Sequence, residues 1–289
     1  MALGWAARVI GYPDLAVVRG LREGGAPWLL RAGDRELVLR VGEPADAASF
    51  ATEVAALRLA ARTGIPVPRL LGHDDGTGAG IPLVLTECVP GSSQIPREPE
   101  PPRLRALGAV AARLHAVTLQ PSRELPARDR PIASVDFAKL RREQRTRGLL
   151  EEAEALVARI RPASSGSVFV HGDLWQGNTL WRDGKLTGLV DWDCAGAGAP
   201  GVDLGSLRCD AAICYGLQAP DHVLAGWEQA AGRAAEDLAY WDVVGALATP
   251  PDMSWFTDAI GDQGRPDLDQ ATLLERRDAF LGQALDRLR

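Results

Sequence analysis

The stretch His171–Asp193, HGDLWQGNTLWRDGKLTGLVDWD, decides the fold of this chain. It follows one apolar run, and it contains a second apolar run just before Asp191. We expect two short strands here, joined by a tight turn at Asp183-Gly184. Such a hairpin would bring Asn178 and Asp191 together although thirteen positions separate them.

Three oxygen-bearing side chains stand at the ends of these strands: Asp173, Asn178 and Asp191. A hard cation such as Mg²⁺ prefers carboxylate and amide oxygens together with substrate phosphates, which suits Asn178 and Asp191. Asp173 is a carboxylate that can accept a proton from a hydroxyl group. One base and two metal ligands are the minimum set for moving a phosphoryl group. Any one aspartate alone is better explained by helix capping or by contact with water, but the whole set at this spacing would rarely arise by chance.

The order His-Gly-Asp, four residues, Asn, then Asp-Trp-Asp after a strand resembles the catalytic and metal-binding loops of the aminoglycoside phosphotransferase family, which is related to the eukaryotic protein kinases. The resemblance implies an α+β, two-lobed, protein-kinase-like fold. A small β-rich N-lobe would span residues 1–88, and a mostly helical C-lobe would span 89–289. Asp193 stands where protein kinases have glycine, and its role stays open. Trp192 replaces their phenylalanine, and we expect it to serve in packing.

The same resemblance implies a reaction. The γ-phosphoryl group of ATP would pass to a hydroxyl of a small molecule, with Mg²⁺ required. Asp173 would be the catalytic base, and Asn178 and Asp191 would hold the metal. A preference for ATP over GTP rests on the family alone, so GTP is not excluded.

Composition restricts the other possibilities. The chain has 289 residues, 46% of them apolar and 24% charged, which is typical of a globular protein. A net charge of −6 argues against a general nucleic-acid binder. The four cysteines show no metal-type pairing, and neither a signal peptide nor a long apolar span is evident. We therefore expect a cytoplasmic enzyme with reduced thiols and no membrane partner, either a monomer or a homodimer.

Negative charge is concentrated in residues 192–270, which hold thirteen acids against three arginines. By the resemblance, this segment lies in the part of the fold that faces the acceptor. The acids form a solvated outer face, or some of them, such as Asp193, Asp252 or Asp258, line a cleft that attracts a cation. In the second case the acceptor is cationic, and its KM rises with ionic strength.

The N-terminal region contains three predicted strands, at about 15–18, 28–30 and 36–41, with glycines at the turns. The turn at Gly24-Gly25 can let backbone N–H groups approach phosphates, or it can be an ordinary hairpin turn. A helix is predicted from about 45 to 62. By position, the family's phosphate-binding basic residue corresponds to Arg40, and the glutamate that orients it corresponds to Glu53. Protein kinases carry lysine at the first position, and arginine offers a fork of different geometry.

The apolar strand that ends near Glu87 is followed by Cys88-Val-Pro-Gly91. This stretch resembles the family's hinge, which would place the carbonyl of Glu87 and the amide of Val89 against the purine. Further along the chain, Asp203 opens a helix, where it is a natural N-cap. The resemblance implies in addition that Asp203 braces the catalytic loop through backbone amides.

The first choice of function is a kinase for an aminoglycoside-like cationic antibiotic. The alternative is a metabolic kinase for an amino alcohol, a sugar or a homoserine-like acceptor. A catalytically silent nucleotide-binding regulator ranks last, because the base and both metal ligands are present. Trp255 and Phe256 do not follow the helical periodicity, and they either line a substrate pocket or form a satellite of the core.

Overall fold

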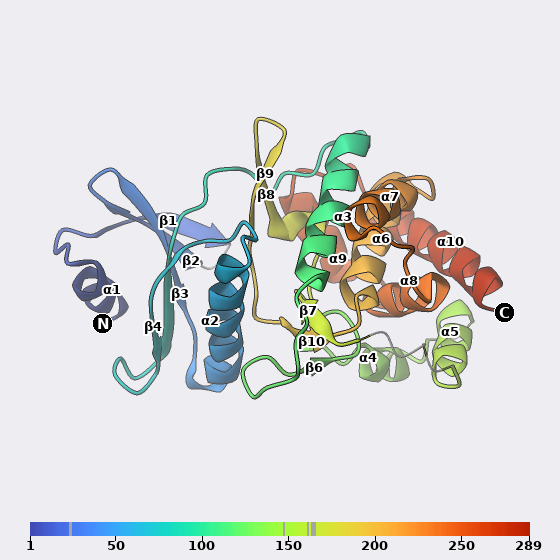
Figure 1. Cartoon of the computed structure of the whole chain (residues 1–289), viewed down its shortest axis with the longest axis horizontal. Coiled ribbons are helices and arrows are strands. Elements are labelled where there is room, and N and C mark those ends of the chain that lie inside the picture. Colours follow the sequence, from blue (N-terminus) through green and yellow to red (C-terminus); the bar gives the residue numbers. More distant parts are fainter. Residues whose placement is uncertain (23–24, 147, 161, 163–165) are drawn as a thin grey trace.

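The computed structural model describes residues 1–22, 25–146, 148–160, 162 and 166–289, and it consists of a β-sheet followed by a group of packed helices (Figure 1). The sheet is antiparallel, with the strand order β1-β2-β3-β5-β4. This arrangement confirms the predicted α+β class; the lobe boundary after residue 88 stays a prediction. The strands are β1 (Ala16–Arg22), β2 (Gly25–Ala32), β3 (Arg35–Val41), β4 (Leu70–Asp75) and β5 (Pro82–Glu87).

The alternation of side chains along β3 separates a core face from a cavity face. Leu37 and Leu39 are buried in a cluster on one face of the sheet. Val38 and Arg40 point to the opposite face and line a cavity, because successive residues of a strand face opposite sides. The helix α2 (Ala47–Arg62), preceded by the 3₁₀ turn η1 (Pro44–Asp46), packs its apolar residues against this second face.

A short helix, α1 (Ala2–Ile10), covers the core face of the sheet and buries Trp5 and Ala6 against it. It ends at Gly11, whose φ of 66° is the left-handed conformation common after a helix. The sequence does not predict this helix, because nine residues are too few for periodicity to identify it.

The remaining described helices form the second part of the molecule (Figure 1). They are α3 (Pro101–His115), α4 (Phe137–Glu143), α5 (Leu149–Val157), α6 (Gly201–Tyr215), α7 (Ala219–Ala231), α8 (Leu238–Leu247), α9 (Ser254–Asp262) and α10 (Gln270–Leu288). No helix of the described residues is both long and apolar enough to cross a membrane.

Two contacts fix the centre of the helical part. The helices α3 and α7 approach so closely that a Cβ at Gly108 would lie 1.9 Å from the Val223 carbonyl oxygen. A buried ion pair joins α6 to α8: Nε of Arg208 donates to Oδ1 of Asp242 at 2.8 Å, and Nη2 donates to Oδ2 at 3.0 Å. This packing fixes the position of α6, against which the loops of the small strands lie.

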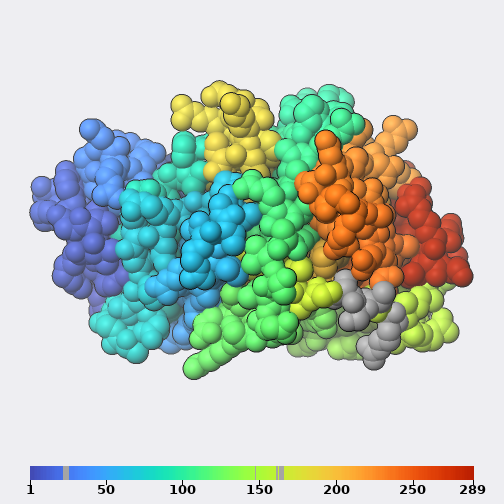
Figure 2. All heavy atoms as spheres, viewed as in Figure 1, coloured from blue at the N-terminus to red at the C-terminus, as the bar shows by residue number. Residues whose placement is uncertain are grey.

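Small strands carry those loops. One small sheet has the order β6-β10-β7, and the hairpin β8-β9 forms another, with the predicted turn at Asp183-Gly184 between its strands. The hairpin lies at the surface between the sheet and α3 (Figure 2, yellow). The elements are β6 (Ala127–Arg128), β7 (Val168–Val170), the 3₁₀ turn η2 (Gln176–Asn178), β8 (Thr179–Arg182), β9 (Lys185–Leu189) and β10 (Gly196–Gly198).

Candidate active site

The loop that follows β7 carries Asp173, and Gly172 determines its path. The φ of Gly172 is 79°, and a Cβ at this position would lie 2.1 Å from the carbonyl oxygen of Cys194. A side chain would therefore both strain the backbone and collide with the segment after β9. The glycine lets the loop of Asp173 lie directly against that segment.

Asp203 holds this loop from α6. Its Oδ2 accepts the N–H of His171 and its Oδ1 accepts the N–H of Gly172, both at 2.8 Å. The predicted brace is thus confirmed, but the predicted N-cap is wrong: α6 begins at Gly201, and Asp203 lies fully buried in its first turn. Hydrogen bonds to an ionised acceptor are stronger than neutral ones, so two of them leave the loop little freedom.

A histidine completes the support of Asp203. Nε2 of His115 lies 3.2 Å from Oδ2 of Asp203, and Nε1 of Trp227 donates to Nδ1 of His115 at 2.9 Å. Since Nδ1 accepts, Nε2 carries the proton and donates to the carboxylate. Burial alone would raise the pKa of Asp203, but the hydrogen bonds and charge interactions of His115 and His171 together outweigh it, and the pKa lies below its ordinary value.

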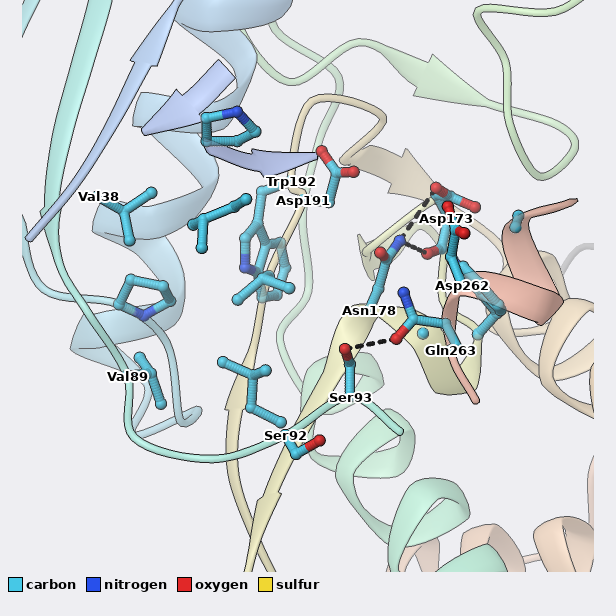
Figure 3. A pocket seen from close by; sticks show the side chains of 18 of the residues that line it. Val38, Val89, Ser92, Ser93, Asp173, Asn178, Asp191, Trp192, Asp262 and Gln263 are labelled. Atoms are coloured by element: carbon cyan, nitrogen blue, oxygen red, sulfur yellow. Dashed lines mark hydrogen bonds between the residues drawn. The ribbon is translucent and has the colours of Figure 1, made fainter. Parts of the chain in front are cut away.

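Asn178 connects the loop to the hairpin. Its Nδ2 donates to the backbone oxygen of Asp173 at 2.9 Å and to Oδ2 of the same residue at 3.0 Å (Figure 3). The N–H of Val190, next to Asp191, donates to the carbonyl of Asn178 at 3.0 Å. The hairpin therefore brings Asn178 and Asp191 to one place, as the sequence predicts.

Arg40 reaches across the cavity from β3 and contacts three carboxylates. Its guanidinium lies 3.1 Å from Glu53, from Asp191 and from Asp193. Burial acts to lower the pKa of Arg40, but these carboxylates more than offset it, so its pKa is raised and the group stays charged. Burial raises the pKa of Glu53 to about 7, although Arg40 opposes the shift. Asp193, whose role the sequence left open, is a partner of Arg40.

The residues around Asp191 are held in an unusual conformation. Asp191 has a φ of 66°, which is uncommon for a residue with a side chain and is often found at functional sites. Trp192 is fully buried and packs against His171 at 4.3 Å and Phe169 at 5.5 Å between ring centroids. The predicted packing role of Trp192 is confirmed, and it anchors the strained aspartate.

The donor chemistry of Asn178 and Asp191 fits Mg²⁺. No group of three His, Cys, Asp or Glu within the described residues is placed to hold a metal ion. Mg²⁺ does not need such a group, because one or two carboxylates with substrate phosphates and waters usually complete its octahedron. Since Nδ2 of Asn178 is used in bonds to Asp173, its Oδ1 is the atom that would act as the ligand.

A cavity of about 1390 Å³ lies between the sheet and the helices (Figure 3). Glu87 and Val89 line it, and their binding of a purine stays a prediction. Gly24 lies outside the described residues. Gly25 opens β2, and its approach to phosphates stays a prediction.

The helical side of the cavity contains residues that the sequence did not single out. Asp210 of α6, Asp262 of α9 and the adjoining Gln263 line it, as do Trp255 and Phe256. The sequence leaves a pocket lining and a core satellite open for Trp255 and Phe256: both line the pocket, and Phe256 also packs against a core cluster. Spacing along the sequence could not identify the two acids, because only the packing of α6 and α9 brings them to the cavity. Of the three acids suspected of lining a cleft, Asp193, Asp252 and Asp258, none is among the lining residues in the described part of the chain.

Comparison with known proteins gives one family and many similar structures. The family model described as phosphotransferase enzyme family matches residues 17–247. An aminoglycoside-3′-phosphotransferase of type VIII is 25% identical, with a TM-score of 0.58 over 84% of this chain and 98% of that one. No curated protein matches the sequence.

Two further solved structures share the fold at lower identity. A macrolide 2′-phosphotransferase from Brachybacterium faecium is 21% identical, with a TM-score of 0.62 over 94% of this chain and 97% of that one. A choline/ethanolamine kinase family protein from Mesorhizobium loti is 19% identical, with a TM-score of 0.55 over 98% of this chain and all of the other. The names of these proteins point to acceptors of very different chemistry.

Proposed function

This chain belongs to the phosphotransferase enzyme family, and on that basis we propose that it transfers the γ-phosphoryl group of ATP to a hydroxyl group of a small molecule. The observation that carries the proposal is the meeting of four side chains in one cavity: Arg40, Asp173, Asn178 and Asp191. They come from the sheet, the loop after β7, η2 and the end of the hairpin. Together they supply a base, metal ligands and a cation, which phosphoryl transfer requires.

Asp173 acts as the base. It accepts the proton of the acceptor hydroxyl while the hydroxyl oxygen bonds to the γ-phosphorus, and the bond from that phosphorus to the bridging oxygen breaks, so that ADP leaves with the electron pair. The hydrogen bond from Asn178 to Oδ2 of Asp173 at 3.0 Å restrains the carboxylate. A restrained base contributes through orientation, which is a large part of catalysis in reactions of this kind.

Asn178 and Asp191 would hold Mg²⁺, and Arg40 would face the phosphates. Mg²⁺, when bound, would stabilise the negative charge on the phosphate oxygens. Arg40 supplies further positive charge from the sheet, and its contacts with Glu53 and Asp193 keep the guanidinium in place. Positioning and electrostatics, rather than covalent chemistry by the protein, account for the rate.

The nucleotide would occupy the side of the cavity formed by the sheet. Val38, Val84 and Val190 provide an apolar surface there, and the carbonyl of Glu87 and the amide of Val89 would bond the purine edge. ATP is the proposed donor, with GTP as the alternative. All four cysteines are free, which suits the reducing cytoplasm where ATP is abundant.

The acceptor is proposed to be a hydroxylated small molecule that carries an amine, such as an antibiotic. A metabolic amino alcohol is the second candidate, favoured by the shared fold of the choline/ethanolamine kinase family protein. The test is a phosphorylation assay with labelled ATP and Mg²⁺ over a panel of macrolides, aminoglycosides, choline and sugars. We expect labelled product from at least one acceptor class, and its formation should be lost in Asp173→Asn.

Two results would oppose this proposal. ATP binding without transfer to any acceptor would favour the silent regulator. Equal product from the wild type and from Asp173→Asn would mean that another group is the base. Hydrolysis of ATP in the absence of an acceptor serves as the background for both measurements.

A further inference from the structure

The wall of the cavity on the helical side is largely apolar, and α9 provides much of it. Trp255 and Phe256 lie at the start of this helix, and both line the cavity. Further apolar side chains surround them from the loop after β6, from α6, from the end of α8 and from α9: Ile132, Ile213, Ala248, Ala259 and Ile260. Because the nucleotide would occupy the sheet side, this wall faces the acceptor.

Three aromatic rings give the wall a defined shape. The ring of Trp255 stacks on that of Phe137 with an interplanar angle of 3° and a centroid distance of 5.9 Å. Phe256 meets Trp255 edge-on at 90° and 5.1 Å. Phe137 is buried, yet Trp255 is 41% exposed, one of the few large apolar side chains left open to solvent. An exposed, stacked indole in a cavity wall is a preformed surface for an apolar ligand.

The C-terminal end of α9 is fixed to the chain segment after Ser92, which holds this part of the wall in place. Oγ of Ser93 donates to Oε1 of Gln263 at 2.5 Å, and the N–H of Ile95 donates to the carbonyl of Gln263 at 2.7 Å. The first of these bonds appears in Figure 3, with Gln263 and Asp262 on the same side of the cavity as Asp173. An acceptor on this wall would therefore lie beside the base.

The charge on this wall is small. Of the thirteen acids in residues 192–270, two are among the lining residues in the described part of the chain, Asp210 and Asp262. Asp210 is buried, and its carboxylate accepts hydrogen bonds from Gln176. Asp262 is exposed at the surface of the cavity. Apart from Asp173, which is the proposed base, the wall thus offers one accessible carboxylate among these acids, which matches one amine and not the several charges of an aminoglycoside.

We infer that the acceptor is an amphiphile: a bulky compound with an apolar ring face that packs on Trp255 and Phe256, and with a single amine that pairs with Asp262. The inference rests on the proposed function, because it describes the acceptor of the same site. The volume of the cavity agrees with an acceptor of this size. A typical ligand pocket holds roughly 300–1,000 Å³, and the cavity of about 1390 Å³ has room for a nucleotide and a bulky partner.

Binding without ATP tests the inference separately from catalysis. The probes are a macrolide with a single amino sugar and a polycationic aminoglycoside, each titrated into the full-length protein by calorimetry. We expect the macrolide to bind at least ~10-fold more tightly. Trp255→Ala should weaken macrolide binding by about 10-fold, because an aromatic contact and its buried area are lost. Trp255→Phe should recover most of the affinity.

Matched variants separate the apolar wall from the charge. Asp262→Asn should weaken macrolide binding by only ~2–5-fold, as expected for an exposed ion pair. Leu217→Ala is the control, since Leu217 is 40% exposed, as Trp255 is, but lies outside the cavity lining. The affinity of the Leu217→Ala variant for the macrolide should equal that of the wild type. Thermal unfolding of each variant shows whether any loss of binding comes from loss of the fold.

The inference is overturned if the aminoglycoside binds more tightly, or if folded Trp255→Ala and Trp255→Phe both keep the full affinity for the macrolide. Addition of ATP then separates the two proposals. A macrolide that binds on Trp255 but receives no phosphoryl group contradicts the proposed function alone. An aminoglycoside that becomes phosphorylated while the macrolide fails to bind contradicts the inference alone.

Discussion

Nη1 of Arg40 lies 3.1 Å from Oδ1 of Asp191, although 151 positions separate the two residues in the sequence. The contact joins the sheet to the segment after β9 across the cavity. It also brings a cation from one side to a proposed metal ligand on the other. Because Asp193 and Glu53 share the same guanidinium, its charge is held by three carboxylates before any phosphate is bound. A nucleotide with Mg²⁺ would redistribute these contacts rather than create a site from separated groups.

The first prediction concerns the base. Asp173→Asn should lower kcat by ~10²–10⁴-fold, the usual contribution of a positioned general base. The amide oxygen of the new side chain can still accept the hydrogen bond that Asn178 donates at 3.0 Å, so the loop should keep its shape. Steady-state kinetics with the best acceptor measures the loss, and nucleotide affinity, measured separately, should stay close to that of the wild type. An unimpaired kcat would remove Asp173 from the mechanism.

The second prediction concerns the metal. Asp191→Ala should abolish the Mg²⁺ dependence of nucleotide binding, because the amide of Asn178 alone is a weak ligand for a hard dication. Asp193→Asn is the matched control: it also removes a carboxylate partner of Arg40, but not a proposed metal ligand. Calorimetric titration of ATP with and without Mg²⁺ compares the two variants. If both keep the Mg²⁺ dependence of the wild type, the metal is held elsewhere.

The loops of the site could be predicted from the sequence because their geometry is local. A tight turn at Asp183-Gly184 is enough to place Asn178 beside Asp191, and the short β8-β9 hairpin has this turn. Order in the chain and family resemblance predict Arg40 as the residue that binds the phosphates. The alternation along β3, which points it into the cavity, agrees with that assignment.

The lining of the acceptor side could not be predicted in this way. The segment 192–270 showed an excess of acids, but only tertiary packing decides which of them reach the cavity. Asp252 accepts hydrogen bonds from the backbone and hydroxyl of Ser254, whereas Asp262 lines the pocket. The predicted N-cap at Asp203 is wrong because sequence patterns do not fix the start of a helix, and α6 begins at Gly201.

The third prediction concerns the ion pair between α6 and α8. Arg208 and Asp242 are each 1% exposed, so Arg208→Met leaves a carboxylate buried without its cation. Such a loss typically costs about 3–5 kcal/mol of unfolding free energy. The double variant Arg208→Met, Asp242→Leu removes both charges and should recover most of that loss. Urea unfolding of the two single variants and the double variant measures the coupling, and additive losses would contradict the prediction.

The fourth prediction concerns Asp210 of α6, which supports the loop after β7 through Gln176. Its Oδ2 accepts hydrogen bonds from the side chain of Gln176 at 2.9 Å and from the backbone of Gln176 at 3.3 Å. Burial raises the pKa of Asp210 to about 6, although these hydrogen bonds oppose the shift. The folded protein therefore favours the neutral carboxyl more strongly than the unfolded chain does, in which the pKa of aspartate is about 3.9.

The stability that the neutral form of Asp210 provides is fully present below pH ~4 and is lost as the pH rises through about 6. Asp210→Asn cannot ionise, and its amide oxygen can still accept a hydrogen bond from Gln176. Relative to this variant, the wild type should lose up to ~3 kcal/mol of unfolding free energy between pH 4 and pH 7, at about 1.4 kcal/mol for each pKa unit. Urea unfolding of both proteins across this range measures the difference, and taking the difference cancels most other titrating groups. A difference that stays constant with pH would mean that Asp210 is ionised throughout and that the network around Gln176 stabilises its charge.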